Sequence, residues 1–244
     1  MKRLEKIAII GSSGDIGIAL TKILLNLDIK LFLHYNKTSK GIKKFNDKKI
    51  NYFSKKIKNK KDCIDVINNA EKTMKGLDAV ILLIGGINKL EKWEDLKQKD
   101  WDHDIKNNLS IPFFLAQHAY KKLKKAGGRI IFCGTASASF AGGKDSLAYG
   151  LSKYCLEFLT KRFAKDGADH NILFNTVAPG FIDSSLHRIK LKKSKLQFSN
   201  RIKMIPLKRA GRPDEVASLI NFLLSEESSY ITGEILKISG GDWL

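Results

Sequence analysis

The fold of this 244-residue chain is decided by one stretch, Lys6-Ile7-Ala8-Ile9-Ile10-Gly11-Ser12-Ser13-Gly14-Asp15-Ile16-Gly17. An apolar run predicts a strand over residues 6–10, and it ends at a glycine-rich turn that leads into the apolar face of a helix. Glycine at such a turn permits a tight bend and lets amides at the helix N-terminus hold a pyrophosphate. The alternative is a simple connection between a strand and a helix.

Outward from this turn, apolar periodicity changes repeatedly from strand-like runs to helical spacing. Strands are predicted over 6–10, 29–35, 50–53, 78–84, 129–133, 171–177 and 235–238, and helices over 16–26, 62–75, 102–125, 147–166 and 214–225. This alternation favours an α/β fold, a Rossmann-type doubly wound parallel sheet of about seven strands with helices on both faces. No composition break divides the chain, so residues 1–244 are expected to form one domain, with a long insertion without strand character over 182–208.

Composition excludes several classes of protein. The chain is 43% hydrophobic, which is enough for a substantial core. Its longest aliphatic run, residues 79–84, is far shorter than the roughly 20 residues of a membrane helix, and the N-terminal apolar stretch is too short for a signal peptide. Three cysteines without C-x-x-C spacing argue against disulfides or a thiolate metal site, so no metal is expected. A cytoplasmic protein without membrane attachment is predicted.

The net charge of +19 suits an anionic partner, but the basic residues that carry it are mostly of a type that argues against nucleic acid. Of 44 basic residues 37 are lysine and seven are arginine, whereas phosphate and base recognition favour the arginine fork. No nucleic-acid-binding motif accompanies the charge. A general lysine-rich surface is the plainer interpretation, and nucleic acid is not expected as a partner.

The end of the second predicted strand bears on the cofactor. It reads His34-Tyr35-Asn36-Lys37-Thr38 and lacks an acidic residue that would bind a ribose 2′-hydroxyl. Asn36, Lys37 and Thr38 are better suited to a 2′-phosphate, which favours NADP(H) over NAD(H). The alternative is that Lys37 is only the first of eleven lysines within residues 37–61.

Tyr149 and Lys153 are the most informative pair. They lie four residues apart on a predicted helix and therefore share a face. A nearby ammonium is expected to lower the pKa of a phenol from about 10 toward neutrality, so that the tyrosine acts as a general acid or base. Alone, the spacing Y-x-x-x-K occurs by chance on many surface helices.

Further stretches accompany this pair in a fixed order: Leu77-Asp78-Ala79-Val80, Trp101-Asp102 through Asn108-Leu109, Asn175 through Asp183, and Tyr230-Ile231-Thr232-Gly233. With these stretches the chain resembles the short-chain dehydrogenase/reductase family over nearly its whole length. The segment from Pro206 through Ala217, with Gly240-Gly241, looks especially like 3-oxoacyl-[acyl-carrier-protein] reductases, although related sugar and alcohol dehydrogenases share much of it.

The resemblance implies hydride transfer between NADP(H) and a carbonyl carbon. Tyr149 would protonate the carbonyl oxygen, Lys153 would hold the nicotinamide ribose, and Asn108 would anchor a water that relays protons. The implied cofactor-binding set is Gly11, Ser13, Asp15, Ile16, Gly17, Asn36, Lys37, Thr38, Gly85, Tyr149, Lys153, Pro179, Gly180, Ile182 and Ser184.

The family also has a catalytic serine that binds the substrate carbonyl. Alignment from Gly128 places Thr135 at this position, and its hydroxyl can donate the same bond. Counting back from Tyr149 by the family's usual spacing instead reaches Ala136, so the loop carries one extra residue. Ser137 is the rival candidate, and a role in the turn is the alternative for either hydroxyl.

Three departures from the family pattern concern the cofactor. Asp15 replaces the middle glycine of the nucleotide turn, with Gly14 one residue earlier. Leu82-Leu83-Ile84-Gly85 stands where Asn-Asn-Ala-Gly is common, which removes polar groups that tie the sheet together. The acid that usually contacts adenine maps near Lys56.

The resulting expectation is an NADPH-dependent reductase of a ketone, most simply a 3-oxoacyl thioester of acyl carrier protein or CoA. Alternatives are a reductase of a small ketone, sugar or pterin, and a non-catalytic NADP(H)-sensing protein. The resemblance also implies a homotetramer built on the helices that carry Asn108 and Tyr149.

A basic flap lies within the insertion, and its charge would suit an acidic carrier protein. The flap consists of Arg188, Lys190, Lys192, Lys193, Lys195, Arg201 and Lys203. Four further lysines, Lys121, Lys122, Lys124 and Lys125, are expected to extend it.

Overall fold

Seven parallel strands form one sheet in the computed structural model, which describes residues 4–38, 41–185 and 194–242. The strand order is β3-β2-β1-β4-β5-β6-β7, and each neighbouring pair is parallel. This arrangement confirms the predicted doubly wound parallel sheet. The strands are β1 (Lys6–Ile10), β2 (Lys30–Tyr35), β3 (Ile50–Ser54), β4 (Ala79–Leu82), β5 (Gly128–Cys133), β6 (Ile172–Pro179) and β7 (Ile235–Ile238).

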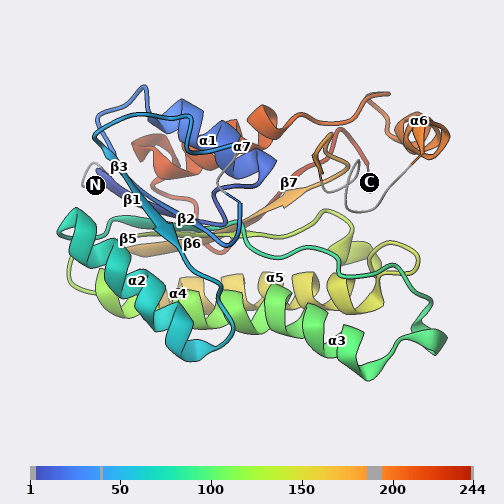
Figure 1. Cartoon of the computed structure of the whole chain (residues 1–244), viewed down its shortest axis with the longest axis horizontal. Helices are drawn as coiled ribbons and strands as arrows, with labels where there is room; N and C mark the ends of the chain where they lie inside the picture. Colours follow the sequence, from blue (N-terminus) through green and yellow to red (C-terminus); the bar gives the residue numbers. More distant parts are fainter. Residues whose placement is uncertain (1–3, 39–40, 186–193, 243–244) are drawn as a thin grey trace.

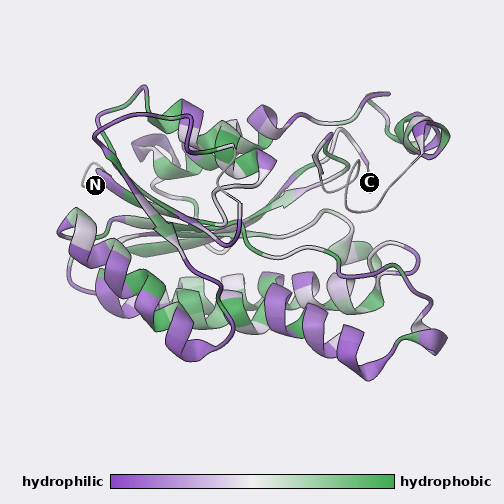
Figure 2. Cartoon of the chain, viewed as in Figure 1, coloured by the Kyte–Doolittle hydropathy of each residue, from purple (hydrophilic) through white to green (hydrophobic). Residues whose placement is uncertain are grey.

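Helices cover both faces of this sheet (Figure 1). Helices α1 and α7 pack together on one face, whereas α2, α4 and α5 lie on the other. In Figure 2 the central strands are mostly hydrophobic and the outer turns of the helices are hydrophilic. The helices are α1 (Asp15–Leu24), α2 (Lys60–Met74), α3 (Gln98–Ile105), α4 (Ile111–Leu123), α5 (Leu147–Ala168), α6 (Lys195–Met204) and α7 (Pro213–Leu224).

The core has two parts, one on each face of the sheet. Strand β1 shows the division, because Ala8 and Ile10 belong to the part under α2, α4 and α5, whereas Ile7 and Ile9 belong to the part under α1 and α7. All four side chains are 0% exposed. A parallel strand buried on both faces needs apolar residues at every position, which explains its unbroken apolar run.

The helix predicted over 102–125 is interrupted. Its residues belong to α3, to a π-helical turn at Lys106–Ser110 and to α4. In this turn the N–H of Ile111 bonds to the carbonyl of Lys106, five residues earlier. Pro112 supplies a physical reason, because it has no N–H to donate to the carbonyl of Asn108, and its ring crowds that carbonyl.

One predicted strand differs from the structure in length. The strand predicted over 78–84 is shorter, since β4 ends at Leu82. The insertion 182–208 contains α6, which begins with a capping box in which Ser194 and Gln197 bond to each other's backbone. Within the described ranges, no helix is long and apolar enough to cross a bilayer.

Strand order also fixes where a ligand can bind. From β1 the chain continues to β2 and β3 on one side, and it returns to β4 on the other side of β1. In such sheets the connections diverge at this switch point and leave a crevice at the carboxyl ends of the strands. The loops after β1, β4, β5 and β6 are therefore the expected walls of a site.

Candidate active site

The nucleotide turn, residues 11–17, follows β1 at the carboxyl edge of the sheet. Gly11 has a φ of 91°, and a Cβ at this position would lie 2.9 Å from the backbone of Leu83. The N–H groups of Gly11 and Ser12 donate to the carbonyl of His34 at 3.1 and 2.9 Å, and Ser12 Oγ donates to the same oxygen at 2.9 Å. The turn is thus fixed to the end of β2.

The first turn of α1 is suited to an anion. Its N-cap, Gly14, has no side chain with which to cap the helix. Amides of a first helical turn have no intrahelical acceptors and attract phosphate groups. They border a cleft of about 340 Å³, here called the nucleotide cleft. Its lining is Gly11, Ser13, Gly14, His34, Asn36, Lys55, Ile57, Leu83, Ile84, Gly85, Asn107 and Ile111, a set that fits the adenosine and diphosphate of a dinucleotide.

Asp15 makes a contact that the sequence analysis did not predict. Its Oδ2 accepts hydrogen bonds from the backbone N–H and the hydroxyl of Ser185, both at 2.7 Å. The carboxylate therefore joins the nucleotide turn to the segment after β6, and Asp15 is not among the residues that line the nucleotide cleft.

Of the three residues at the end of β2 predicted to bind a 2′-phosphate, one lies in the nucleotide cleft. Asn36 lines the nucleotide cleft, whereas Lys37 and Thr38 are exposed residues outside its lining. Side chains alternate along an extended chain, so His34 and Asn36 face the cleft while Tyr35 packs into the opposite core.

Helix α5 brings Tyr149 and Lys153 to the end of β5. Lys153 Nζ lies 5.8 Å from the centroid of the Tyr149 ring and donates to the carbonyl of Cys133 at 2.7 Å. The Lys153 residue is only 3% exposed. The pair thus forms a buried contact of the kind that the helical spacing predicts.

Tyr149 lines a second cleft of about 480 Å³, here called the catalytic cleft. Thr135 and Ser137 both line it, and their hydroxyl oxygens lie 3.3 Å apart. Thr135 also lowers the pKa of the Tyr149 phenol, which indicates that its side chain lies near this group and favours Thr135 over Ser137 as the partner of a substrate carbonyl. The remaining lining is Ile16, Ile87, Leu90, Cys133, Gly134, Gly143, Lys144, Ser146, Pro179, Gly180, Phe181, Ile182, Ser184, Arg201 and Met204.

Asn108 lies in the π-helical turn and is 0% exposed. Its Oδ1 accepts from the N–H of Gly86 at 2.7 Å, and its Nδ2 donates to the carbonyls of Gly86 and Asp104 at 3.2 and 3.0 Å. One side chain therefore ties the loop after β4 to the helix. This contact supplies polar bonds in the loop where the sequence lacks the family's asparagines.

The pKa shifts around Tyr149 differ from the sequence expectation. Burial raises the pKa of the Tyr149 phenol, and only the hydrogen bond from Thr135 opposes this rise. Burial also lowers the pKa of Lys153. The expected lowering of the tyrosine pKa is therefore absent in the protein alone, because Lys153 Nζ bonds to Cys133 and both groups are desolvated.

The segment after β6 forms the far wall of the catalytic cleft through Ile182 and Ser184. The backbone of Gly211 holds it in place: its N–H donates to Phe181 at 2.9 Å, and its carbonyl accepts from Asp183 at 2.8 Å. Gly180 packs closely as well, since a Cβ there would lie 2.8 Å from Ser239.

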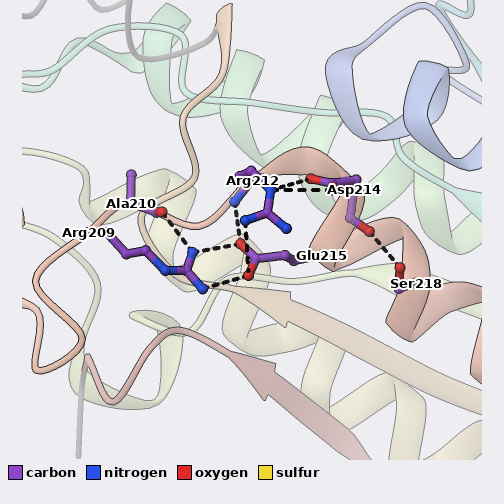
Figure 3. Close-up of polar contacts among 6 residues, drawn as sticks. All are labelled: Arg209, Ala210, Arg212, Asp214, Glu215 and Ser218. Atoms are coloured by element: carbon purple, nitrogen blue, oxygen red, sulfur yellow. Dashed lines mark hydrogen bonds and ion pairs between the residues drawn. The ribbon is translucent and has the colours of Figure 1, made fainter.

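Glu215 organises the chain around Gly211 (Figure 3). Both Arg209 Nη atoms bond to its carboxylate at 2.8 and 2.6 Å, and the N–H of Arg212 donates to it at 2.7 Å. These contacts lower the Glu215 pKa from 4.5 to about 2. The cluster begins α7 and supports the wall of the catalytic cleft from behind.

Replacing Glu215 with Gln is expected to destabilise the protein in a pH-dependent way. The folded-state pKa of about 2 lies below the ordinary 4.5, so this stabilisation is present above pH 4.5 and is lost as pH falls toward 2. We expect about 1 kcal/mol at pH 7, because Arg209 is partly exposed and screened. Urea denaturation at pH 7 and pH 3 measures it, with Glu94→Gln as the control. An equal loss at both pH values would contradict the ion-pair explanation.

The structure describes only three of the seven basic residues of the flap. Arg188, Lys190, Lys192 and Lys193 lie outside the described residues. Arg201 lines the catalytic cleft and pairs with Asp242, whereas Lys195 and Lys203 are exposed.

The lysines at the end of α4 do not extend this flap. They come just before β5 begins and thus lie at the amino edge of the sheet, opposite the clefts. Lys122 pairs there with Glu71 at 2.6 Å.

Comparison with known proteins places this geometry in a family. A family model described as enoyl-(acyl carrier protein) reductase matches residues 11–242. A 3-oxoacyl-[acyl-carrier-protein] reductase of Buchnera aphidicola is 31% identical over 97% of this chain and 96% of its own. The chain belongs to the short-chain dehydrogenase/reductase family. It is therefore an oxidoreductase of a family that uses a nicotinamide cofactor.

Other proteins resemble the chain too. A 2-dehydro-3-deoxy-D-gluconate 5-dehydrogenase of Bacillus subtilis is 35% identical over 65% of this chain and 62% of its own. The crystal structure of the TT0495 protein from Thermus thermophilus is 24% identical, with a TM-score of 0.88 over 99% of this chain and 98% of that one. The latter match shows that the two chains share the same fold.

Sequence reasoning missed several residues of the two clefts in this short-chain dehydrogenase/reductase. His34 and Lys55 line the nucleotide cleft, and Ile87 and Leu90 line the catalytic cleft. His34 and Lys55 follow from the parallel register of β2 and β3, in which His34 lies beside Phe53. No motif marks that register, and only the order of the strands would have revealed it.

Proposed function

We propose that this chain uses NADPH to reduce the ketone of a 3-oxoacyl thioester. The observation that carries the proposal is that Thr135 and Tyr149 line one cleft bordered by apolar side chains. Ile87, Leu90 and Met204 line this cleft, and they suit an acyl chain better than a polyhydroxylated sugar. The Buchnera relative, named for 3-oxoacyl reduction and matched over nearly its full length, adds support.

In this mechanism bound NADPH supplies the hydride to the carbonyl carbon. The Thr135 hydroxyl orients the carbonyl oxygen, and Tyr149 donates the proton that this oxygen gains. Its raised pKa keeps the phenol protonated at neutral pH, as reduction requires. Lys153 would hold the nicotinamide ribose, and Asn108 fixes the loop after β4 against the helix. Asn36, and the exposed Lys37 and Thr38 next to it in the chain, would provide polar groups for the 2′-phosphate.

The first test measures the loss of reduced-cofactor absorbance with an acetoacetyl thioester, using NADPH and NADH in parallel. The comparison substrates are a crotonyl thioester, a simple ketone and a 2-keto sugar acid. Turnover of the acetoacetyl thioester with NADPH well above the other pairs is expected. Preference for the sugar acid would favour a sugar dehydrogenase instead. Binding of NADPH without turnover of any substrate would favour a cofactor-sensing protein.

The basic flap suits an acidic carrier protein that delivers the thioester. Lys195 and Lys203 are exposed on α6, beside the Arg201 that lines the catalytic cleft. The double substitution Lys195→Glu and Lys203→Glu is expected to raise KM about tenfold for a carrier-bound thioester and to leave KM for a free thioester unchanged. Steady-state kinetics with both substrates measures this. An equal change for both would contradict docking of a carrier.

We also propose that the chain assembles with copies of itself through α4 and α5. Along α5, Leu151, Tyr154 and Phe158 are 40, 53 and 71% exposed and share one face. A groove lined by Phe113 and Phe163 continues this apolar surface between α4 and α5. Exposed apolar surfaces of this kind are typical of protein interfaces.

Phe158→Glu is expected to convert the assembly to smaller species, because it places a charge at the centre of this face. Light scattering coupled to size-exclusion chromatography measures the mass. Leu27→Glu is the matched control, since Leu27 is 40% exposed in the loop after α1. A wild-type protein that is already monomeric, or an unchanged mass in Phe158→Glu, would contradict this interface.

A further inference from the structure

The loop after β4, residues 83–92, carries two of the apolar side chains that line the catalytic cleft, Ile87 and Leu90. Gly85 and Gly86 in the same loop both have positive φ and contribute no side chain. Packing alone therefore cannot hold this stretch in place. Hydrogen bonds fix the loop instead, on both sides of each apolar residue.

Ile87 lies between two residues whose backbones are bonded to helices. The N–H of Gly86 donates to the π-helical turn at 2.7 Å. On the other side, the N–H of Asn88 donates to Asp104 Oδ1 at 3.0 Å, and the Asn88 side chain donates to Asp100 Oδ1 at 2.8 Å. Because neighbouring Cα atoms are only about 3.8 Å apart, these two attachments fix the backbone of Ile87 as well.

Asp104 is a buried acid on α3, only 5% exposed. A carboxylate in such a place is costly unless its oxygens receive hydrogen bonds, and the N–H of Asn88 supplies one. His103 Nδ1 lies 3.5 Å from the same oxygen. The backbone carbonyl of Asp104 accepts from Asn108 Nδ2 at 3.0 Å and from Ser152 Oγ at 3.4 Å. The residue thus joins the loop to a helix that is itself fixed against α5.

Leu90, the other apolar residue, is held independently of α3. The N–H of Glu91 donates to the carbonyl of Asp145 at 2.8 Å, which joins this end of the loop to the segment after β5. Ile87 and Leu90 therefore line one cleft but depend on different bonds.

We propose that Asp104 is a positioning residue for substrate selection: through Asn88 it holds Ile87 in the wall of the catalytic cleft and so limits the length of acyl chain that the cleft accepts. This inference rests on the proposed function, because it takes a 3-oxoacyl thioester as the substrate. The side chain of Ile87 is β-branched and has few rotamers, so the position of its backbone decides how far it projects into the cleft.

The test measures kcat/KM for acetoacetyl-CoA and 3-oxodecanoyl-CoA. The quantity compared is the ratio of the longer to the shorter substrate, because a loss of folded protein lowers both values equally. Ile87→Ala is expected to raise this ratio about tenfold, since it removes apolar bulk from the cleft wall. Asp104→Leu keeps a side chain of similar size that cannot accept the bond from Asn88, and it is expected to raise the ratio about fivefold.

Two double variants show whether Asp104 acts through Ile87. Asp104→Leu combined with Ile87→Ala is expected to give the ratio of Ile87→Ala alone, because no isoleucine remains to be positioned. Asp104→Leu combined with Leu90→Ala is expected to give the product of the two single effects, since Leu90 is held by a different bond.

Asp104→Asn separates the hydrogen bond from the charge. Its amide oxygen can accept from the N–H of Asn88, so the ratio should stay within about twofold of the wild type. Asp102→Leu is the matched control, because Asp102 is exposed on the same helix and accepts from Gln98 at 2.8 Å. It should keep the wild-type ratio. If circular dichroism shows that Asp104→Leu is unfolded, Asn88→Ala replaces it, with an expected rise of about threefold from loss of the bond to Asp100.

Three results would overturn the role of Asp104 while leaving the proposed function intact. They are an unchanged ratio in the folded Asp104→Leu protein or in its replacement, an equal shift in Asp104→Asn, and a product of the single effects when Asp104→Leu is combined with Ile87→Ala. A wild type that reduces neither thioester would overturn both.

Discussion

Tyr149→Phe is expected to lower kcat for ketone reduction by about 10²- to 10⁴-fold, the contribution of a positioned general acid. The substitution removes only the hydroxyl, and the ring that packs 5.8 Å from Lys153 Nζ is kept. Dissociation constants for the reduced cofactor should therefore stay within about twofold of the wild type. Stopped-flow hydride transfer, together with cofactor fluorescence, separates the two effects.

Tyr154→Phe is the matched control for this experiment. Tyr154 lies on the same helix but is 53% exposed and does not line the catalytic cleft. The Tyr154→Phe protein should reduce the ketone at the wild-type rate. If Tyr149→Phe retained more than about a tenth of the rate, the phenol would not be the proton donor, and the Thr135 hydroxyl would have to be tested in its place.

Gly85→Ala is expected to have the second large effect. Gly85 has a φ of 113°, and a Cβ there would lie 2.4 Å from Asn108 Oδ1 and 3.4 Å from Lys153 Nζ. The backbone strain alone costs roughly 1–3 kcal/mol. Relief of the clash must move Asn108 away from Gly86, which disturbs the loop between the two clefts. We expect a lower Tm and at least a tenfold loss in kcat/KM.

The control for this substitution is Gly14→Ala. Gly14 also lines the nucleotide cleft, but its φ is −75°, and the nearest atom to a Cβ there, the carbonyl oxygen of Gly11, lies at an ordinary 3.7 Å. Its Tm should stay close to that of the wild type. Thermal melts with and without cofactor distinguish lost folding from lost binding. A Gly85→Ala protein with unchanged Tm and rate would show that the loop adjusts without affecting Asn108.

The central strands were predictable because burial on both faces leaves unbroken apolar runs, as in β1 and β4. The interruption of the helix at Asn108 was harder to see, although Pro112 was its visible signal. Helix α6 had a signal too, in the spacing of Ser194 and Gln197, which is typical of a capping box.

The candidate site also has features that the sequence predicts and features that it does not. Tyr149 and Lys153 could be paired from helical spacing alone, because that relation is local. The direction of the Tyr149 pKa shift could not be predicted from the sequence. It depends on burial and on the hydrogen bond from Lys153 to the carbonyl of Cys133, which lies on another element. The contact between Asp15 and Ser185 depends on a separation that no local pattern encodes.

That last contact has a consequence for synthesis of the protein. Asp15 and Ser185 are 170 residues apart in the chain. A nascent chain that has emerged from the ribosome only as far as β5 already holds the nucleotide turn and the strands around it. It still lacks Ser185 and the segment after β6, which bridge this turn and wall the catalytic cleft. The walls of the two clefts can therefore be complete only after translation has passed Ser185.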